Sequence, residues 1–219
     1  MPKPLTAPLS TSPTTTTSPA STLPSTACFS DTLPLPKILV FDLDYTLWPL
    51  WVDTHVSPPL KPADAAGLTV QDRHGEKFGF YRDVAGLMVH AKEKGMMLGA
   101  ASRTSAPDVA ERALRLLTVP LGEAGEGPKG PTAWSLFDVL EIYPGDKKVH
   151  FERIRKKTGL PFEEMLFFDD ERRNKNVESL GVTMRLVRDG VTVEEVEKGV
   201  GEWRGRNGRV KAEGGENGV

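Results

Sequence analysis

The feature that most constrains the fold is a short apolar run, Lys37–Phe41, which prolines precede and carboxylates follow. The run shows no alternation of polar and apolar residues, so it predicts a strand that is buried on both faces. Similar runs occur at Met96–Ala101, Met165–Phe168 and Val182–Val187, with a weaker one at Val139–Tyr143. Helical patterns separate these runs, so the chain predicts an α/β fold, a parallel sheet with helices on both faces.

The helical patterns have recognisable ends. They cover Arg82–Lys94, Ser105–Leu117, Asp146–Thr158 and Glu171–Leu180. Gly95, Gly159 and Gly181 follow three of them, as expected of glycines that end helices. Ser105 is a candidate N-cap, with a proline in the turn that follows it.

Composition divides the chain into a folded unit, residues 36–200, and two tails. Residues 1–35 are rich in Ser, Thr and Pro and residues 201–219 in Gly and charge, so both are predicted to be disordered. Within the folded unit, residues 48–79 carry several prolines and no helical stripe, which predicts a hairpin-rich flap without a helix. The Gly/Pro-rich residues 118–132 are predicted to form a surface insertion.

The overall composition excludes several classes of protein. A chain of 219 residues with a net charge of -2 has no basic excess for binding nucleic acid. It has no apolar run of the roughly 20 residues that a membrane span needs and no secretory signal, so we expect a cytoplasmic, or nuclear, monomer. A transit peptide would also be rich in Ser, but Lys3 is the only basic residue of the first tail. Cys28 is the only cysteine, so neither an internal disulfide nor a thiolate zinc site is expected.

Polar residues directly follow three of the predicted strands. These residues are Asp42 and Asp44 after the first strand, Ser102 and Arg103 after the second, and Asp169 and Asp170 after a later one. In an open parallel sheet the carboxyl ends of neighbouring strands form the ligand site, so these side chains should converge. Taken singly, such pairs more often cap a turn, but their joint position favours a site. Carboxylates that lie so close need a cation, and oxygen ligands alone favour Mg²⁺.

The segment Phe41–Thr46 (FDLDYT) resembles the first motif of the haloacid dehalogenase superfamily. Longer stretches resemble the eukaryotic magnesium-dependent phosphatase family, also called magnesium-dependent acid phosphatases: Asp42–Val56, Ala100–Ser105, Glu141–Ile154 and Phe167–Asn174. The resemblance covers nearly the whole folded unit and implies a Rossmann-like fold. Because the first gap between motifs is short, we expect the flap in place of a true cap domain.

The resemblance implies a role for each carboxylate. Asp42 would be the nucleophile that forms an aspartyl phosphate, and Asp44 would be the general acid and base. Asp42, the backbone carbonyl of Asp44 and Asp170 would bind Mg²⁺, with Asp169 behind them. The sequence leaves open which of Asp169 and Asp170 binds the metal directly.

The resemblance also implies how phosphate and leaving group are bound. Lys147 would balance the charge of the nucleophile and the phosphoryl group. Ser102 and Leu43 would contact the phosphate, whereas Arg103 and Trp51 would contact the leaving group.

The other aromatic and imidazole side chains receive no chemical role. Trp48 is expected to pack the flap onto the core. None of the histidines has ligand spacing, and none is assigned to catalysis: His55, His74, His90 and His150.

The resulting hypothesis is a magnesium-dependent phosphatase that hydrolyses phosphate monoesters. The substrate would be a small phosphorylated metabolite or a phosphopeptide, and an open site would admit phosphotyrosine or a glycated amine that carries a sugar phosphate. A phosphotransferase is one alternative, although such enzymes normally exclude water with a cap. A catalytically silent binding module is the other, although such relatives usually lack the nucleophile or the acid.

Overall fold

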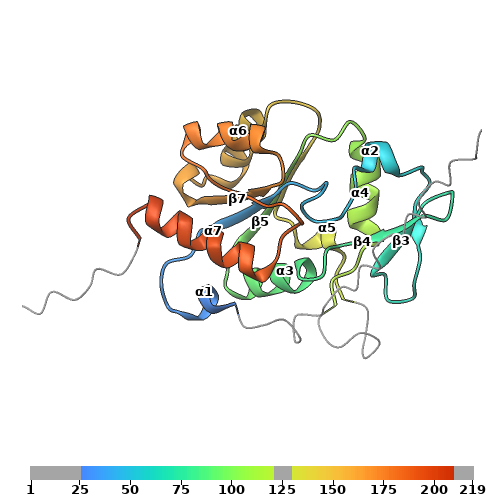
Figure 1. The fold of residues 1–219 in the computed structure, drawn as a ribbon, viewed down its shortest axis with the longest axis horizontal. Helices are drawn as coiled ribbons and strands as arrows, with labels where there is room; N and C mark the ends of the chain where they lie inside the picture. Colours follow the sequence, from blue (N-terminus) through green and yellow to red (C-terminus); the bar gives the residue numbers. More distant parts are fainter. Residues whose placement is uncertain (1–25, 121–129, 210–219) are drawn as a thin grey trace, which may run out of the picture.

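A five-stranded parallel sheet forms the centre of the protein (Figure 1). The computed structural model describes residues 26–120 and 130–209. Its strands are β1 (Ile38–Phe41), β5 (Met97–Ser102), β6 (Val139–Ile142), β7 (Met165–Asp169) and β8 (Thr183–Leu186). Their order in the sheet is β6-β5-β1-β7-β8. The predicted strands and the parallel sheet are confirmed, and the order places β1 between β5 and β7.

Both faces of the sheet are buried, as the unbroken apolar runs predicted. Ile38 and Val40 of β1 pack in one apolar cluster with Phe151, whereas Leu39 and Phe41 pack in the other. In register, Phe41 pairs with Ala100 of β5 and Phe168 of β7. The residues that follow these pairs therefore lie at one edge of the sheet.

Helices cover the two faces unequally. The apolar cluster around Ile38 contains side chains from α6 (Lys147–Thr158) and from the 3₁₀ helices η2 (Phe162–Glu164) and η3 (Arg172–Leu180). The other cluster includes α3 (Val84–Glu93), α4 (Pro107–Leu116), α5 (Ala133–Leu136) and α7 (Val193–Arg206). Within the described ranges, no helix combines the length and the apolar character that crossing a membrane requires.

The predicted helices are present, with local corrections. Gly95 and Gly159 follow α3 and α6 in left-handed conformations, with φ of 75° and 72°. Ser105 is not the N-cap of α4, because Ala106 occupies that position and the Ser105 hydroxyl donates to Asp53 at 2.8 Å. The segment before Gly181 forms a 3₁₀ helix, and α5 and α7 were not predicted.

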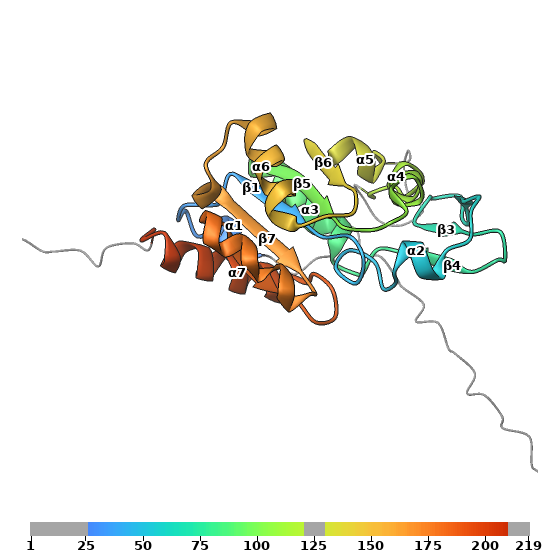
Figure 2. The same cartoon turned by 90° about the horizontal axis from the view of Figure 1, so that it is seen from above.

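The flap extends beyond one end of the sheet (Figure 2). Its β2 (Lys61–Pro62), β3 (Thr69–Gln71) and β4 (Lys77–Gly79) form a small antiparallel sheet, as predicted. The expectation of a flap without a helix is wrong, because α2 (Val52–His55) forms a single turn there. One turn is too short to show the apolar stripe by which a helix is recognised in a sequence.

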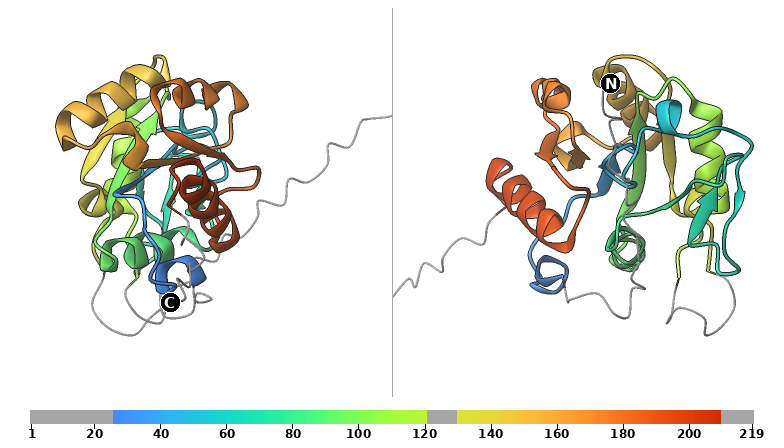
Figure 3. Two further views of the ribbon diagram at one scale, coloured as in Figure 1. Left: turned by 90° about the vertical axis from the view of Figure 1, so that its left-hand side faces the viewer. Right: turned by 45° about the vertical axis from the view of Figure 1, so that its right-hand side comes forward.

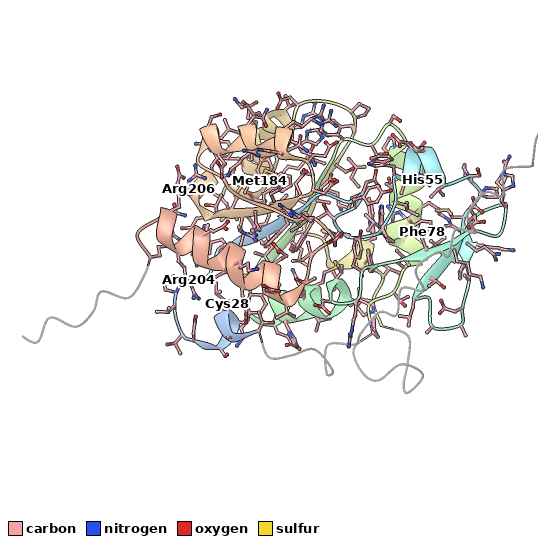
Figure 4. The ribbon with its side chains drawn as sticks, in the orientation of Figure 1. Cys28, His55, Phe78, Met184, Arg204 and Arg206 are labelled. Atoms are coloured by element: carbon pink, nitrogen blue, oxygen red, sulfur yellow. The ribbon has the colours of Figure 1, made fainter. Side chains whose placement is uncertain are left out.

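The predicted disorder of residues 1–35 and 201–219 is wrong next to the core. Figure 3 shows α1 (Ala27–Ser30) beside α7, and Figure 4 shows Cys28 and Arg204 close together. Arg204 donates to the Asp31 carboxylate at 2.5 Å and to the Cys28 carbonyl at 3.0 Å. Trp203 is fully buried, so the folded unit extends through α7, past residue 200. The rest of both predicted tails, residues 1–25 and 210–219, lies outside the described residues.

The predicted insertion, residues 118–132, begins and ends as a paired segment. Thr118 and Thr132 form an antiparallel bridge, and the Val119 amide donates to the Pro131 carbonyl at 2.9 Å. Residues 121–129 lie outside the described residues.

Candidate active site

An open cleft of about 280 Å³ lies at the carboxyl ends of β1, β5 and β7. The strand ends and the start of α6 contribute polar side chains to it, and the flap contributes an aromatic one. Its lining includes Asp42, Asp44, Ser102, Lys147, Asp170 and Trp51. The structure therefore brings together residues that lie far apart in the sequence.

A buried lysine lies between two of the carboxylates. Lys147, the first residue of α6, is 1% exposed. Its Nζ donates to Asp42 Oδ1 at 2.6 Å, lies 3.1 Å from Asp169 Oδ2 and also donates to the Ala101 carbonyl. Asp146 caps α6 by accepting from the Lys148 amide at 2.8 Å, which fixes the start of the helix. The position of Lys147 thus depends on a helix start that packs against β5.

The ionisation of this group follows from its burial. Burial raises the pKa of Asp42 well above its usual value, Lys147 opposes that rise, and Asp169 adds to it. For Lys147, burial lowers the pKa, but the nearby Asp42 and Asp169 outweigh burial, so the net pKa is raised. The lysine therefore keeps its proton, and one positive charge faces more than one carboxylate.

The neighbouring Asp169 and Asp170 differ in their contacts. Asp169 is fully buried and accepts hydrogen bonds from the Glu171 amide at 2.7 Å and from Asn174 Nδ2 at 2.9 and 3.0 Å. Asp170 is partly exposed and lines the cleft. Burial, followed by the charges of Asp169 and Glu171, raises the pKa of Asp170 to about 7. Asp169 is therefore held by protein donors, whereas Asp170 faces the cleft.

Three carboxylates can converge on one point. Asp42, Asp169 and Asp170 each offer an oxygen atom, and these atoms lie within 4.8 Å of one another. Carboxylates at this separation repel one another unless a proton or a cation lies between them. An all-oxygen donor set of this kind fits a hard divalent cation.

Asp44 lies in a tight turn after β1. It is 8% exposed, and its Oδ1 accepts from Trp48 Nε1 at 2.7 Å and from the Val52 amide at 3.2 Å. Burial raises the pKa of Asp44 to about 6, although both hydrogen bonds oppose that rise. A carboxyl group with a pKa in this range can both give and take a proton near neutral pH.

The residues predicted to bind phosphate occupy different positions. Ser102 is buried at the end of β5, and its Oγ accepts from the Thr104 amide at 3.3 Å. Arg103 also lines the cleft and donates to Asn174 Oδ1 at 3.1 Å. The Leu43 side chain is fully buried in the core, so only its backbone could contact a phosphate.

Trp51 is the most exposed aromatic group of the cleft, with 47% of its surface accessible. Its ring is stacked on His55, with a centroid separation of 5.7 Å, and meets Tyr45 edge-on at 5.0 Å. Trp48, in contrast, is fully buried against the flap, as predicted. Trp51 therefore presents a partly exposed aromatic ring to the cleft, whereas Trp48 does not.

Sequence reasoning missed residues that organise the cleft. Asn174 links Arg103 to Asp169, and Asp53 on the flap accepts from the Ser105 amide at 3.2 Å. The ring nitrogens of His150 lie 3.0 Å from the Asp146 and Ser102 carbonyls. All of these residues lie within the stretches that resemble the phosphatase family, and that position is the only signal by which they could have been suspected.

Comparisons with known proteins identify the family of this chain. The profile of the family described as Acid Phosphatase matches residues 34–206. The chain is 45% identical over 148 residues to a HAD-like hydrolase superfamily protein of Schizosaccharomyces pombe, covering 68% of this chain and 83% of that one. It is 43% identical over 168 residues to a Homo sapiens protein named magnesium-dependent phosphatase 1, covering 76% of this chain and 86% of that one.

The protein has a parallel sheet, with carboxylates at the ends of β1 and β7 and a lysine at the start of α6. These features are those of an α/β protein of the haloacid dehalogenase-like type. The chain belongs to the acid phosphatase family of that superfamily. The resemblance noted in the sequence is thus confirmed.

Proposed function

We propose that this protein hydrolyses phosphate monoesters with the help of Mg²⁺ and through a phosphorylated Asp42. The observation that carries the proposal is the convergence of Asp42, Asp169 and Asp170 within 4.8 Å beside the buried Lys147. The human relative is named a magnesium-dependent phosphatase, which supports the same activity here.

The residues present fit the metal. Asp42, Asp170 and the backbone carbonyl of Asp44 would hold Mg²⁺, because Asp169 already accepts hydrogen bonds from Asn174 and from the Glu171 amide. When bound, Mg²⁺ offsets the negative charge of the carboxylates and of the phosphoryl oxygens. We therefore infer that Asp170 makes the direct contact and that Asp169 orients Lys147.

The reaction consists of two displacements. An oxygen of Asp42 attacks phosphorus, the bond to the leaving oxygen breaks, and Asp44 gives its proton to that oxygen. Asp44 then takes a proton from water, the water oxygen attacks phosphorus, and the bond to Asp42 breaks. Lys147 and the Ser102 hydroxyl bind phosphoryl oxygens and hold them in line during both steps.

The flap bears on the class of substrate. It is a small sheet with one helical turn, and the cleft beneath it stays open to water, which favours hydrolysis over transfer to a second substrate. The exposed Trp51 face and the Arg103 guanidinium suit a leaving group that is flat or carries hydroxyls or negative charge. Phosphotyrosine peptides and sugar phosphates of glycated amines both meet this description.

The test uses the purified full-length chain and p-nitrophenyl phosphate, with Mg²⁺ or with a chelator. We expect hydrolysis only with the metal, and Asp42→Asn should lower the turnover by at least about 10³-fold. Acid quenching with ³²P-labelled substrate should trap label on the wild type and not on Asp42→Asn. Normal turnover of Asp42→Asn would show that the nucleophile is another group.

A further inference from the structure

The contacts of Asp44 are asymmetric. The indole Nε1 of Trp48 and the amide of Val52 both donate to Oδ1, at 2.7 and 3.2 Å. An oxygen that accepts from two N–H groups is a poor place for the proton of a carboxylic acid, because that oxygen already has hydrogen atoms directed at it. The proton of Asp44 therefore belongs on Oδ2.

The turn after β1 produces this arrangement. The Leu43 carbonyl accepts from the Thr46 and Leu47 amides, at 3.2 and 2.8 Å, and Tyr45 adopts a φ of 52°. This tight turn brings Trp48 back beside Asp44, where the two residues form an isolated bridge. The single turn of α2 then begins at Val52, so its first free amide points at the same carboxylate.

The flap holds the Trp48 ring in place. The ring is fully buried, is stacked on Phe80 with a centroid separation of 6.1 Å, and meets Phe78 of β4 edge-on at 6.0 Å. The Tyr81 amide also donates to the Leu47 carbonyl at 2.8 Å, which ties the end of the flap to the turn. The indole N–H is the one polar atom of this buried ring, and it points at Asp44.

We propose that Trp48 is a positioning residue for catalysis: its indole N–H, together with the Val52 amide, fixes the rotamer of Asp44 so that Oδ2 delivers the proton to the leaving oxygen. This proposal rests on the proposed function, because it says which groups orient Asp44, the general acid of that reaction. As the bond between phosphorus and the leaving oxygen breaks, its electron pair stays on that oxygen, which takes the Oδ2 proton. Without the indole N–H, the carboxyl group can rotate and direct its proton elsewhere.

The consequence depends on the leaving group. A leaving oxygen of low basicity, such as p-nitrophenolate, departs without a proton, whereas an alkoxide needs one. Trp48→Phe keeps an aromatic ring against Phe80 and removes the donor along with part of the buried ring, a loss of volume that the Trp203→Phe control below shares. We expect kcat/KM of Trp48→Phe to fall by about 10-fold or more for an alkyl phosphate and by less than about 3-fold for p-nitrophenyl phosphate.

The experiment measures kcat/KM for a series of aryl and alkyl phosphates, because kcat/KM reports the steps up to phosphorylation of Asp42. A plot of its logarithm against the leaving-group pKa should be steeper for Trp48→Phe than for the wild type. Trp203→Phe is the matched control, because Trp203 is equally buried and its Nε1 donates to the Glu163 carbonyl at 2.8 Å, away from the cleft. This control should keep the wild-type slope.

A second variant covers the case in which Trp48→Phe does not fold. Val52→Pro removes the other N–H at the first position of α2, where proline is tolerated, and should steepen the plot in the same direction. Equal losses for all substrates, or an unchanged slope in both variants, would overturn the proposal. If Asp44→Asn steepens the plot and Trp48→Phe does not, the positioning role of Trp48 is wrong, although Asp44 is still the general acid. If Asp44→Asn leaves the slope unchanged and Asp42→Asn stays active, the proposed function itself fails.

Discussion

The two walls of the cleft are held by different kinds of contact. The strand-end wall, which carries Asp42, Ser102 and Asp169, follows directly from the sheet, whose ladder continues through the Asp42 amide to the Phe168 carbonyl at 2.9 Å. The flap wall, which carries Trp51 and α2, is held by ring contacts, by one helical turn and by hydrogen bonds from Ser105 to Asp53. The proposed nucleophile and phosphate contact therefore lie on the strand-end wall, and the proposed leaving-group contact, Trp51, lies on the wall that is easier to change.

The largest expected effect concerns the strand-end wall. Lys147→Met should lower the free energy of unfolding by about 3–5 kcal/mol, because it leaves Asp42 and Asp169 buried without their cation. Chemical denaturation measures this effect, and turnover should fall with it. Lys148→Met is the matched control and should change little. Equal losses in both variants would mean that the buried ion pairs do not stabilise this wall.

Removal of the metal should affect the same wall. Saturating Mg²⁺ stabilises the folded state, by about 2.7 kcal/mol at 100 times its Kd. A thermal melt with Mg²⁺ and with a chelator should show this difference in the wild type and lose most of it in Asp170→Asn. Asp53→Asn, on the flap wall, should keep the difference. If only Asp53→Asn lost the stabilisation by Mg²⁺, the metal would lie against the flap.

The walls should respond to pH with opposite signs when the metal is absent. Burial and its acidic neighbours raise the pKa of Asp170 to about 7, so the folded state binds a proton that the unfolded state releases near pH 4. The stability that depends on Asp170 therefore falls as the pH rises from about 4 to about 7.

On the flap, burial raises the pKa of Asp64, but hydrogen bonds from Thr69 and nearby amides outweigh burial and lower it. The Asp64 contribution is thus present above about pH 4 and is lost as the pH falls through its folded-state pKa. The free energy of unfolding should be measured against pH. Asp170→Asn should change it between about pH 4 and pH 7, and Asp64→Asn should change it below about pH 4. A change in the same pH range for both variants would contradict the contrast between the two walls.

The smallest expected effect is on binding at the flap wall. Trp51→Ala should raise KM for an aryl phosphate by about fivefold, the loss of one aromatic contact, and leave kcat unchanged. The midpoint of unfolding should stay near that of the wild type, because Trp51 is 47% exposed. Val149→Ala, at another exposed apolar side chain, is the control. A fall in kcat without a change in KM would place Trp51 in the chemical step.

The sequence predicted the strand-end wall better than the flap wall, for a physical reason. Apolar runs such as Lys37–Phe41 and Met165–Phe168 show where strands end, and the parallel arrangement then brings Asp42 and Asp169 together. The hydrogen bonds from Trp48 and Val52 to Asp44 depend on the conformation of one turn. No periodic pattern encodes such a turn, so the orientation of the acid could only be seen in the structure.

The ends of the folded unit escaped prediction for a related reason. Ala27–Ser30 lies in a polar, proline-rich stretch that has no core of its own. Its order comes from contacts with the core and with α7, such as the one from Arg204 to the Asp31 carboxylate, 173 residues away in sequence. Contacts between such distant residues leave no local trace in composition, and composition was the basis for predicting disorder.

The contacts of Glu164, just before β7, bear on how this enzyme can be immobilised or labelled. Its carboxylate pairs with Arg209, and its carbonyl accepts from the Lys37 amide at 3.0 Å, so the segment before β1 and the segment after α7 meet where the strands begin. The cleft opens where those strands finish. A reporter or carrier protein joined at Arg209 would therefore be anchored at the edge of the sheet opposite the cleft and would leave the cleft facing outward.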